Sequence, residues 1–274
     1  NFLNSVIYKL NKKADKKIME QGFSLSFLNE FNKKLLDNRK ERFLRQDIIN
    51  RARHPWLRAN TVDFDPRLHQ FLPKNKRKSL MNNLNDFIRE SDFSPLITAA
   101  IAYGQLCMIH PWRYANGRTT GALIPYIFNT LGLTKERSFF LSSTFRKNKE
   151  KYYLELTKLL KEESWQYWIK YFLESVKKQA VSFQKEIDYI VEIYPKLKRE
   201  VEKILKSLKL SQIIKAILRQ PIFTPSDLYK KHSFSSTQLY SFIGALKEHD
   251  YLKTDNRKNH VNYMVSEIYP ILNM

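Results

Sequence analysis

Apolar side chains recur at helical spacing over most of the chain, and the clearest segment lies near its centre. This segment starts at Ser94 and Pro95, with apolar positions at Leu96, Ile97, Ala100, Ile101, Leu106, Met108 and Ile109. Serine is favoured just before a helix and proline is favoured in its first turn, so the pattern predicts a largely buried helix entered through these two residues. Pro111 lacks a backbone N–H and is expected to end the helix.

The same spacing returns after a short break. It predicts a second helix that begins at about Asn116 and has its apolar positions at Leu123, Ile124, Ile127, Phe128 and Leu131. The first backbone N–H groups of a helix have no partner within the helix. Ala115, Asn116 and Gly117 are therefore expected to present N–H groups that, together with the helix dipole, attract an anion.

The C-terminal third begins with a long charged helix. Periodic apolar positions predict this helix from Lys177 to about Leu208, with a kink at Pro195. The helix is expected to connect two domains. We assign residues 1–180 to the first domain, residues 181–208 to the connecting helix and residues 209–274 to the second domain.

The second domain is predicted to contain three helices and two strands. The helices are expected at 211–218, in a segment that opens at 223–229, and from Ser235 to Glu248. Residues 251–253 and 261–265 have strand-like patterns and flank a basic loop at 256–260. This order resembles a winged helix-turn-helix domain, in which the third helix enters the DNA major groove.

Composition narrows the class of protein. The chain has 274 residues, 43% of them hydrophobic, which is enough for two domains with real cores, and its six glycines favour helices over hairpins. Its single cysteine, Cys107, excludes a disulfide framework and is expected to be a small core residue. No apolar run reaches the ~18 residues of a membrane span, and the start Asn1-Phe2-Leu3-Asn4 lacks a signal-peptide pattern, so we expect a soluble, cytoplasmic protein without membrane contact.

The net charge of +21 suggests nucleic-acid binding. The charge is spread evenly, however: residues 206–274 carry 10 Lys and Arg against 5 Asp and Glu, and residues 1–205 carry 38 against 22. An even spread is typical of a general bias toward lysine. Charge alone therefore does not assign a nucleic-acid partner.

The break between the two central helices holds the residues with the clearest chemistry. His110 is placed at the end of the first helix, where it can accept a proton from an attacking hydroxyl group. Arg118 adds a cation to the first turn of the second helix, and its planar guanidinium suits phosphate oxygens. A histidine at a helix end is often only structural, and an Asn-Gly pair is often only a turn. In combination, the spacing predicts a catalytic base beside a phosphate-binding helix end.

The segment from His110 to Gly121 resembles the signature of the Fic family, HPFx(D/E)GNGRxxR, in the form HPxxxxNGR. The resemblance extends over about residues 5–180. It includes the helical segment from Leu10 to Asp37, a flap near 64–73, and segments similar to the family's SxYFxxNRxxYYxxL and WxxWxxFFL motifs, at 143–156 and 165–173. The resemblance implies a mainly α fold, a Fic-type helical bundle with a small β flap, here followed by a winged helix.

The resemblance implies transfer of AMP from ATP, the co-substrate, to a hydroxyl group of a target protein. His110 would be the general base, and the flap would align the target segment by strand addition through Phe71, Leu72 and Pro73. The nucleotide would be bound by Ala115, Asn116, Gly117, Arg118, Gly121, Asn148, Tyr152 and Tyr153.

The chain departs from the family signature at several positions. Tyr114 stands where the family has an acidic residue that holds Mg²⁺, and a neutral phenol is a poor Mg²⁺ ligand, so the Mg²⁺ that the resemblance implies is left possible but doubtful. Gly121 stands where the family has a second arginine for the terminal phosphate. Ala115 replaces a glycine, and Trp112 replaces the usual phenylalanine. Ser26–Glu30 matches only half of the family's inhibitory helix motif and is interpreted as coincidence.

Two classes of function therefore remain open. The first is a nucleotidyltransferase whose winged helix recruits a partner. The second is a catalytically inactive regulator that acts through the winged helix. DNA contacts in that domain would come from Ser236, Thr237, Gln238, Arg257 and Lys258. The alternative partners of the domain are the Fic domain itself or a second copy of the chain, which would form a homodimer.

Overall fold

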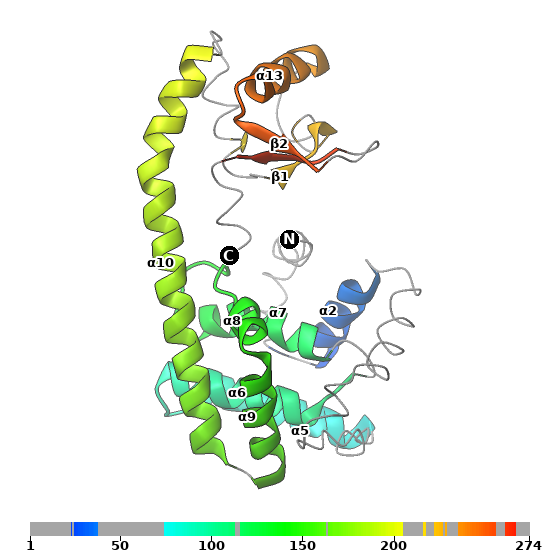
Figure 1. Cartoon of the computed structure of the whole chain (residues 1–274). Helices are drawn as coiled ribbons and strands as arrows, with labels where there is room; N and C mark the ends of the chain where they lie inside the picture. The colour runs from blue at the N-terminus through cyan, green and yellow to red at the C-terminus, as the bar shows by residue number, and fades with distance from the viewer. Residues whose placement is uncertain are drawn as a thin grey trace. The chain divides into compact units, whose positions relative to one another are not determined.

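The computed structural model describes Phe23 and residues 25–37, 74–112, 116–162, 164–204, 216–217, 222–226, 228, 235–255 and 261–266. The chain divides into two compact units, residues 1–180 and 181–274, which are considered separately (Figure 1). Helices dominate the described residues of the first unit, and a short sheet occurs in the second. The predicted mainly α fold is confirmed.

The described part of the first unit is a helical bundle. Its helices are α2 (Leu25–Asp37), α5 (Lys74–Glu90), α6 (Pro95–Ile109), α7 (Asn116–Thr130), α8 (Ser142–Lys147), α9 (Lys149–Glu162) and the first part of α10 (Trp165–Ile204). α6 contacts α5, α7 and α9, and α2 contacts α5 and α7. α6 is therefore the central helix of the bundle.

The predicted central helix is confirmed as α6. Pro95 occupies its first turn, and the N–H of Thr98 donates to the carbonyl of Ser94 at 3.0 Å. Its apolar residues surround the helix, which is the pattern of a helix buried on all sides. Gly104 permits the close packing, because a Cβ there would lie 3.0 Å from side-chain atoms of Leu159, Trp165 and Trp168.

An aromatic cluster joins α6 to the helices that follow the second central helix. Neighbouring rings in this cluster have centroids 5.0–6.5 Å apart. The rings belong to Tyr103, Phe145, Tyr152, Trp168, Tyr171 and Phe172. Trp168 is fully buried, and its indole N–H donates to the carbonyl of Ala100 at 2.9 Å. Burying rings of this size contributes much of the apolar stabilisation of the bundle.

The second predicted central helix is confirmed as α7. Residues 119–128 of α7 are buried, and the helix continues through Pro125. On the α2 side, Phe31 meets Tyr126 edge to face, with 5.7 Å between ring centroids. α7 is thus held between α6 and α2, and its N-terminal end has a fixed position in the bundle.

α10 joins two segments that the sequence suggests separately. The predicted helices at 165–173 and from Lys177 onward form one helix of 40 residues, which continues through Pro195. No glycine or proline interrupts residues 174–176, so nothing in the local sequence ends the first segment.

The second unit contains a three-stranded antiparallel sheet. Its strands are β1 (Ile222–Phe223), β2 (Leu252–Thr254) and β3 (Tyr263–Val265), in the order β1-β3-β2. α13 (Ser236–Glu248) precedes β2, and Ser235 caps it with a reciprocal pair of hydrogen bonds to Gln238. The predicted third helix and the two predicted strands are therefore present.

The second predicted helix of this unit opens within 223–229, as expected, but a strand precedes it that the sequence pattern did not predict. Ile222 and Phe223 form β1, and helical structure begins at Pro225. A residue that precedes proline disfavours the helical conformation, so Thr224 separates the two elements. Phe223 is buried and stacks on Tyr263, which favours the strand position.

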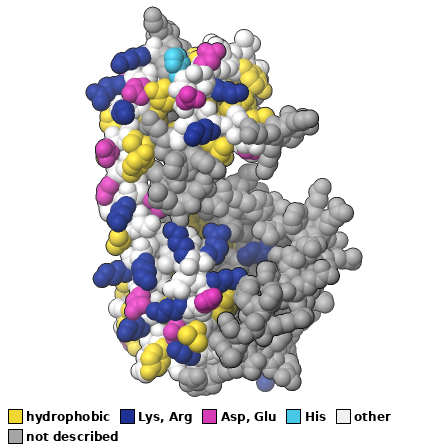
Figure 2. Space-filling model, in the orientation of Figure 1, with side chains coloured by type: hydrophobic (Ala, Val, Ile, Leu, Met, Phe, Trp, Pro, Cys, Tyr) yellow, Lys and Arg dark blue, Asp and Glu magenta, His cyan; other side chains and the backbone are white. Residues whose placement is uncertain are grey.

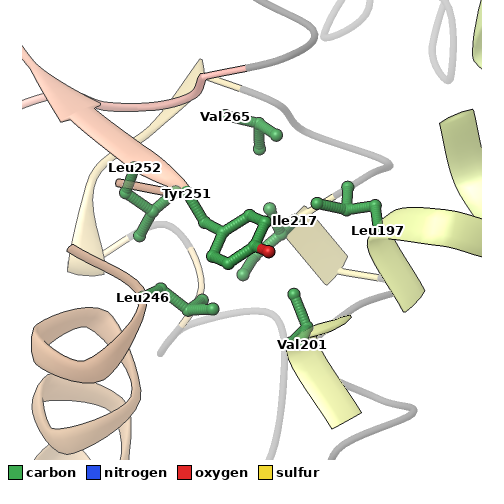
Figure 3. A pocket seen from close by; sticks show the side chains of 7 residues that line it. All are labelled: Leu197, Val201, Ile217, Leu246, Tyr251, Leu252 and Val265. Carbon is green, nitrogen blue, oxygen red and sulfur yellow. The ribbon is translucent and has the colours of Figure 1, made fainter. Parts of the chain in front are cut away.

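The last turns of α10 belong to the core of the second unit. Leu197 and Val201 are 4% and 5% exposed and pack with residues of the sheet and α13. Figure 3 shows their side chains converging with those of Ile217, Leu246, Tyr251, Leu252 and Val265 around a small apolar cavity of about 20 Å³. The hydroxyl of Tyr251 also donates to the carboxylate of Glu200. The hydrophobic core of the second unit therefore includes α10 residues that precede the strands of the sheet by some 20 to 70 positions in the sequence.

Charged side chains are distributed over both units. Figure 2 shows Lys and Arg side chains spread over the visible face, with Asp and Glu side chains among them. No helix among the described residues is long and apolar enough to cross a membrane.

Candidate functional site

The candidate site is the loop that joins α6 to α7. His110 ends α6: its N–H donates to the carbonyl of Leu106 at 3.2 Å, and its backbone adopts the left-handed conformation with φ 45° and ψ 57°. Residues other than glycine rarely adopt this conformation, and it often closes a helix. The chain therefore turns sharply at His110, whose side chain is partly buried.

Asn116 closes the loop from the other side. Its Oδ1 accepts a hydrogen bond from the N–H of Trp112 at 2.9 Å, and its Nδ2 donates to the carbonyl of Trp112. Asn116 is only 5% exposed. The amide side chain is thus used to shape the loop, while the expected role of the nearby backbone N–H groups in binding phosphate remains a prediction.

Two other helices hold the same loop. Arg77 of α5 donates from Nη1 to the carbonyl of Pro111 at 2.9 Å. The indole N–H of Trp112 donates to Oδ1 of Asn29 in α2, also at 2.9 Å. The exchange of phenylalanine for tryptophan therefore adds a polar contact that a phenyl ring cannot make. Contacts from α2, α5 and α7 together fix the backbone on the C-terminal side of His110.

The first turn of α7 is open at one face and anchored at the other. Gly117 is exposed, and, apart from its chain neighbours and its own helix backbone, no heavy atom of the described residues would lie within 4 Å of a Cβ at this position. Arg118 is partly buried beside it. Thr119 is fully buried and accepts a hydrogen bond from Nδ2 of Asn32 at 2.8 Å. A rigid helix start with open space and a cation suits an anion.

Gly121 lies in a different environment. It is buried, and a Cβ at this position would lie 2.9 Å from Oγ of Ser142 at the start of α8. A larger residue therefore requires movement of the Ser142 side chain. The start of α8 occupies the space next to the position where the family signature has its second arginine.

The three expected nucleotide contacts beyond α7 lie in unlike surroundings. Asn148 is exposed at the C-terminal end of α8. Tyr152 packs in the aromatic cluster, and its hydroxyl lies 3.3 Å from that of Tyr103. Tyr153 contacts the ring of Tyr152 at 5.2 Å between centroids. Burial raises the pKa of Tyr152, so its hydroxyl stays neutral. Tyr152 has a clear structural role, and nucleotide contact by any of the three remains a prediction.

Cys107 is a core residue, as predicted. It is 7% exposed, and its Sγ lies 3.9 Å from the hydroxyl of Tyr152. Burial raises the pKa of its thiol to about 12. The thiolate, which is the nucleophilic form of cysteine, is therefore scarce at neutral pH.

Several predicted site residues lie outside the described residues. They are the flap residues Phe71, Leu72 and Pro73, the loop residues Tyr114 and Ala115, and the basic residues Arg257 and Lys258.

Among the described residues, no cluster of side chains suits Mg²⁺. Tyr114 occupies the position of the acidic ligand in the family signature. The described residues contain no group of three or more His, Cys, Asp and Glu side chains that could hold a metal ion. Mg²⁺ prefers carboxylate and other oxygen ligands in octahedral geometry, and a neutral phenol does not supply one.

In the second unit, the first turn of α13 is open to solvent. Ser236, Thr237, Gln238 and Tyr240 are exposed, and Tyr240 is 59% exposed. The Oε1 atom of Gln238 accepts from the N–H of Ser235, so part of this side chain is used in capping. Lys247, in the last turn, is the sole Lys or Arg of this helix.

The residues of α2 and α5 that support the loop have no signal in the sequence. Asn29 and Arg77 precede His110 by 81 and 33 positions, and neither belongs to a recognisable motif. The run of basic residues around Arg77 has the pattern of a solvated helix face. Only the packing of α2 and α5 against the central helices brings these two side chains to the loop.

The part of the chain that contains this loop is similar to a known protein family. Residues 22–128 match the model of the Fic/DOC family. The match covers α2, α5, α6 and nearly all of α7. Among solved structures, a Fic family protein from Desulfovibrio desulfuricans G20 matches with 15% sequence identity and a TM-score of 0.40, over 72% of this chain and 57% of that one. The chain thus spans somewhat more than half the length of that protein.

Proposed function

Because residues 22–128 form a Fic/DOC family domain, we propose that the chain transfers AMP from ATP to a hydroxyl group of a target protein. The observation that carries the proposal is the loop between α6 and α7. A histidine stands at one end of this loop, an open helix start with an arginine stands at the other, and contacts from three helices hold Pro111 and Trp112. This is the arrangement that attack of a hydroxyl group on a phosphate requires.

In the proposed reaction, His110 accepts the proton of the target hydroxyl. The hydroxyl oxygen forms a bond to the α-phosphorus of ATP, and the bond from that phosphorus to the β-phosphate oxygen breaks. Pyrophosphate leaves with the electron pair, and AMP remains on the target through a phosphodiester bond. The left-handed turn at His110 supports this role, because it fixes the direction in which the residue leaves α6.

The first turn of α7 would bind the phosphates. The backbone N–H of Gly117 and the guanidinium of Arg118 would donate to phosphate oxygens as negative charge shifts from the α-phosphate to the leaving group. The absence of a side chain at Gly117 allows an anion to approach the backbone. Because Tyr114 and Gly121 provide neither a metal ligand nor a second arginine, we expect slow turnover compared with a chain that has the full signature.

Labelling with ATP that carries ³²P at the α-phosphate tests the proposal. The chain is incubated with the nucleotide and a cell lysate, beside the His110→Ala variant and an exposed matched control, His249→Ala. The proposal predicts protein bands that appear with the unmodified chain and with His249→Ala and that disappear with His110→Ala. Equal labelling by all three proteins would reject His110 as the base.

A second candidate function is a nucleotide-binding regulator without turnover. It is favoured by one observation: the Cβ position of Gly121 is only 2.9 Å from Oγ of Ser142. Ser142 therefore occupies the space beside the position where the family signature has a phosphate-binding side chain. Under this alternative, calorimetry detects ATP binding, while labelling of lysate proteins remains at the level of His110→Ala.

For the second unit, we propose a winged helix that contacts DNA or protein through α13. The exposed residues Ser236, Thr237 and Gln238 support a contact role for its first turn, whereas the scarcity of cations on α13 weakens the case for DNA. If DNA is the partner, its affinity for the full chain falls steeply with salt concentration, and the double variant Arg257→Ala, Lys258→Ala flattens that slope by about two phosphate contacts. Absence of duplex binding at low salt would favour a protein partner.

A further inference from the structure

Arg77 reaches the candidate site from a helix that no part of the motif predicts. It lies in the first turn of α5, and its Nη1 donates to the carbonyl of Pro111, the residue directly after His110. Its Nε is buried and has no hydrogen-bond partner among the described residues. A contact to one carbonyl therefore uses only part of a side chain that offers five donors.

The charge of Arg77 has no negative partner in the part of the chain that the structure describes. The ion pairs of the described residues join Lys151 to Glu174, Lys158 to Glu155 and Lys198 to Glu202, and none includes Arg77. Partial burial of a cation without a negative partner costs free energy. A backbone carbonyl offsets only part of this cost. An anionic ligand that meets the terminal Nη groups of Arg77 beside the loop would supply the missing charge.

The loop has a second arginine at its other end. Arg118 belongs to the first turn of α7, and Arg77, in the first turn of α5, contacts the carbonyl of Pro111 at the start of the loop. Gly121 cannot provide a charge, and the space beside it is taken by Ser142. Two guanidinium groups from different helices at one short loop match a ligand with several phosphate groups better than a ligand with one.

We propose that Arg77 binds the phosphate chain of the nucleotide, while its contact with Pro111 keeps the loop in position. This inference rests on the proposed function, since it assigns a further residue to the same nucleotide site. It gives the site a second cation that the motif itself lacks. A purely structural role, in which Arg77 only supports the loop, predicts a different response to substitution.

The test compares Arg77→Gln with Arg89→Gln, a substitution of the exposed arginine in the last turn of the same helix. Glutamine keeps a polar amide but is shorter and carries no charge, so adenosine binding is the readout that shows whether the loop is preserved. Binding of ATP and of adenosine is measured by calorimetry, and folding is followed by thermal melting. We expect Arg77→Gln to weaken ATP binding by on the order of 10-fold or more, with unchanged adenosine binding, and Arg89→Gln to change neither.

Four other results would overturn the inference. Equal ATP binding by the two glutamine variants would leave Arg77 without a ligand role, and equal losses for ATP and adenosine would assign it to loop structure alone. If Arg77→Gln does not fold, Arg77→Lys replaces it, and this charged variant must retain more ATP affinity than Arg77→Ala. Failure of the unmodified chain to bind ATP would reject the proposed nucleotide function itself, and the assignment of Arg77 with it.

Discussion

Gly117→Ala separates binding at the candidate site from stability of the fold. Because a Cβ at position 117 meets no heavy atom of the described residues within 4 Å, apart from its chain neighbours and its own helix backbone, alanine fits without displacing a described side chain. Alanine also restricts the unfolded chain more than glycine does, so the substitution is expected to stabilise the protein by about 0.4 to 1 kcal/mol. For a chain of this size, that gain corresponds to a rise of roughly 1 to 4 °C in Tm.

The same substitution is expected to impair nucleotide binding. A helical Cβ points toward the N-terminal end of its helix, so the added methyl group would enter the space in which the phosphates approach the first turn of α7. Loss of one charge-assisted hydrogen bond costs about 1.5 to 3 kcal/mol, which is roughly a 10- to 150-fold weaker affinity. The variant should therefore melt at a higher temperature and bind ATP less tightly.

Gly244→Ala is the matched control. Gly244 is also helical and also has no heavy atom within 4 Å of its Cβ position, but it lies in α13 of the second unit. It should raise Tm in the same way and leave ATP binding unchanged. ATP affinity of Gly117→Ala equal to that of Gly244→Ala, with both proteins folded, would refute the assignment of the α7 start as the phosphate site.

Three further predictions concern packing and reactivity. Gly121→Arg alone should lower Tm because its Cβ lies 2.9 Å from Oγ of Ser142, whereas Gly121→Arg with Ser142→Ala should recover Tm and raise ATP affinity in calorimetry. Cys107 should resist iodoacetamide in the native protein at pH 8, because a pKa of about 12 lowers its thiolate fraction by roughly a thousandfold relative to an ordinary thiol. It should react with iodoacetamide once the protein is denatured, and mass spectrometry measures both results. The fragment 206–274 should lack a cooperative thermal transition, whereas the fragment 189–274 should show one. The shorter fragment lacks Leu197 and Val201 of α10, whose burial contributes about 3 to 6 kcal/mol to the free energy of unfolding. Each prediction has an outcome that would contradict it. These outcomes are reaction of native Cys107 with iodoacetamide, a higher Tm for Gly121→Arg alone, and cooperative melting of the fragment 206–274.

The sequence predicts the helices that carry local signals. α6 begins with a Ser-Pro pair and ends before Pro111, and α13 begins with a capping serine, so their bounds follow from short-range chemistry. The strand at Phe223 was missed because two residues give too short a pattern to separate a strand from a helix start. Its place depends on pairing with β3, about 40 positions later in the chain.

The site shows the same division between local and long-range information. The order of His110, Asn116 and Arg118 along the chain suffices to predict a base beside a helix start. The use of the Asn116 side chain to close the loop could not be read from the sequence, because an Asn-Gly pair allows several turn geometries. The contacts of Arg77 and Asn29 depend on tertiary packing and have no local signal.

The central claim is that the loop between α6 and α7 transfers the α-phosphate of ATP with its nucleoside, using His110 as the base. The most direct measurement is a parallel reaction with ATP labelled at either the α- or the γ-phosphate, in which label retained on protein is counted for the unmodified chain and for His110→Ala. We expect the unmodified chain to retain the α-label on protein and not the γ-label, and we expect His110→Ala to retain neither. Retention of the γ-label, or α-labelling that survives in His110→Ala, would contradict it.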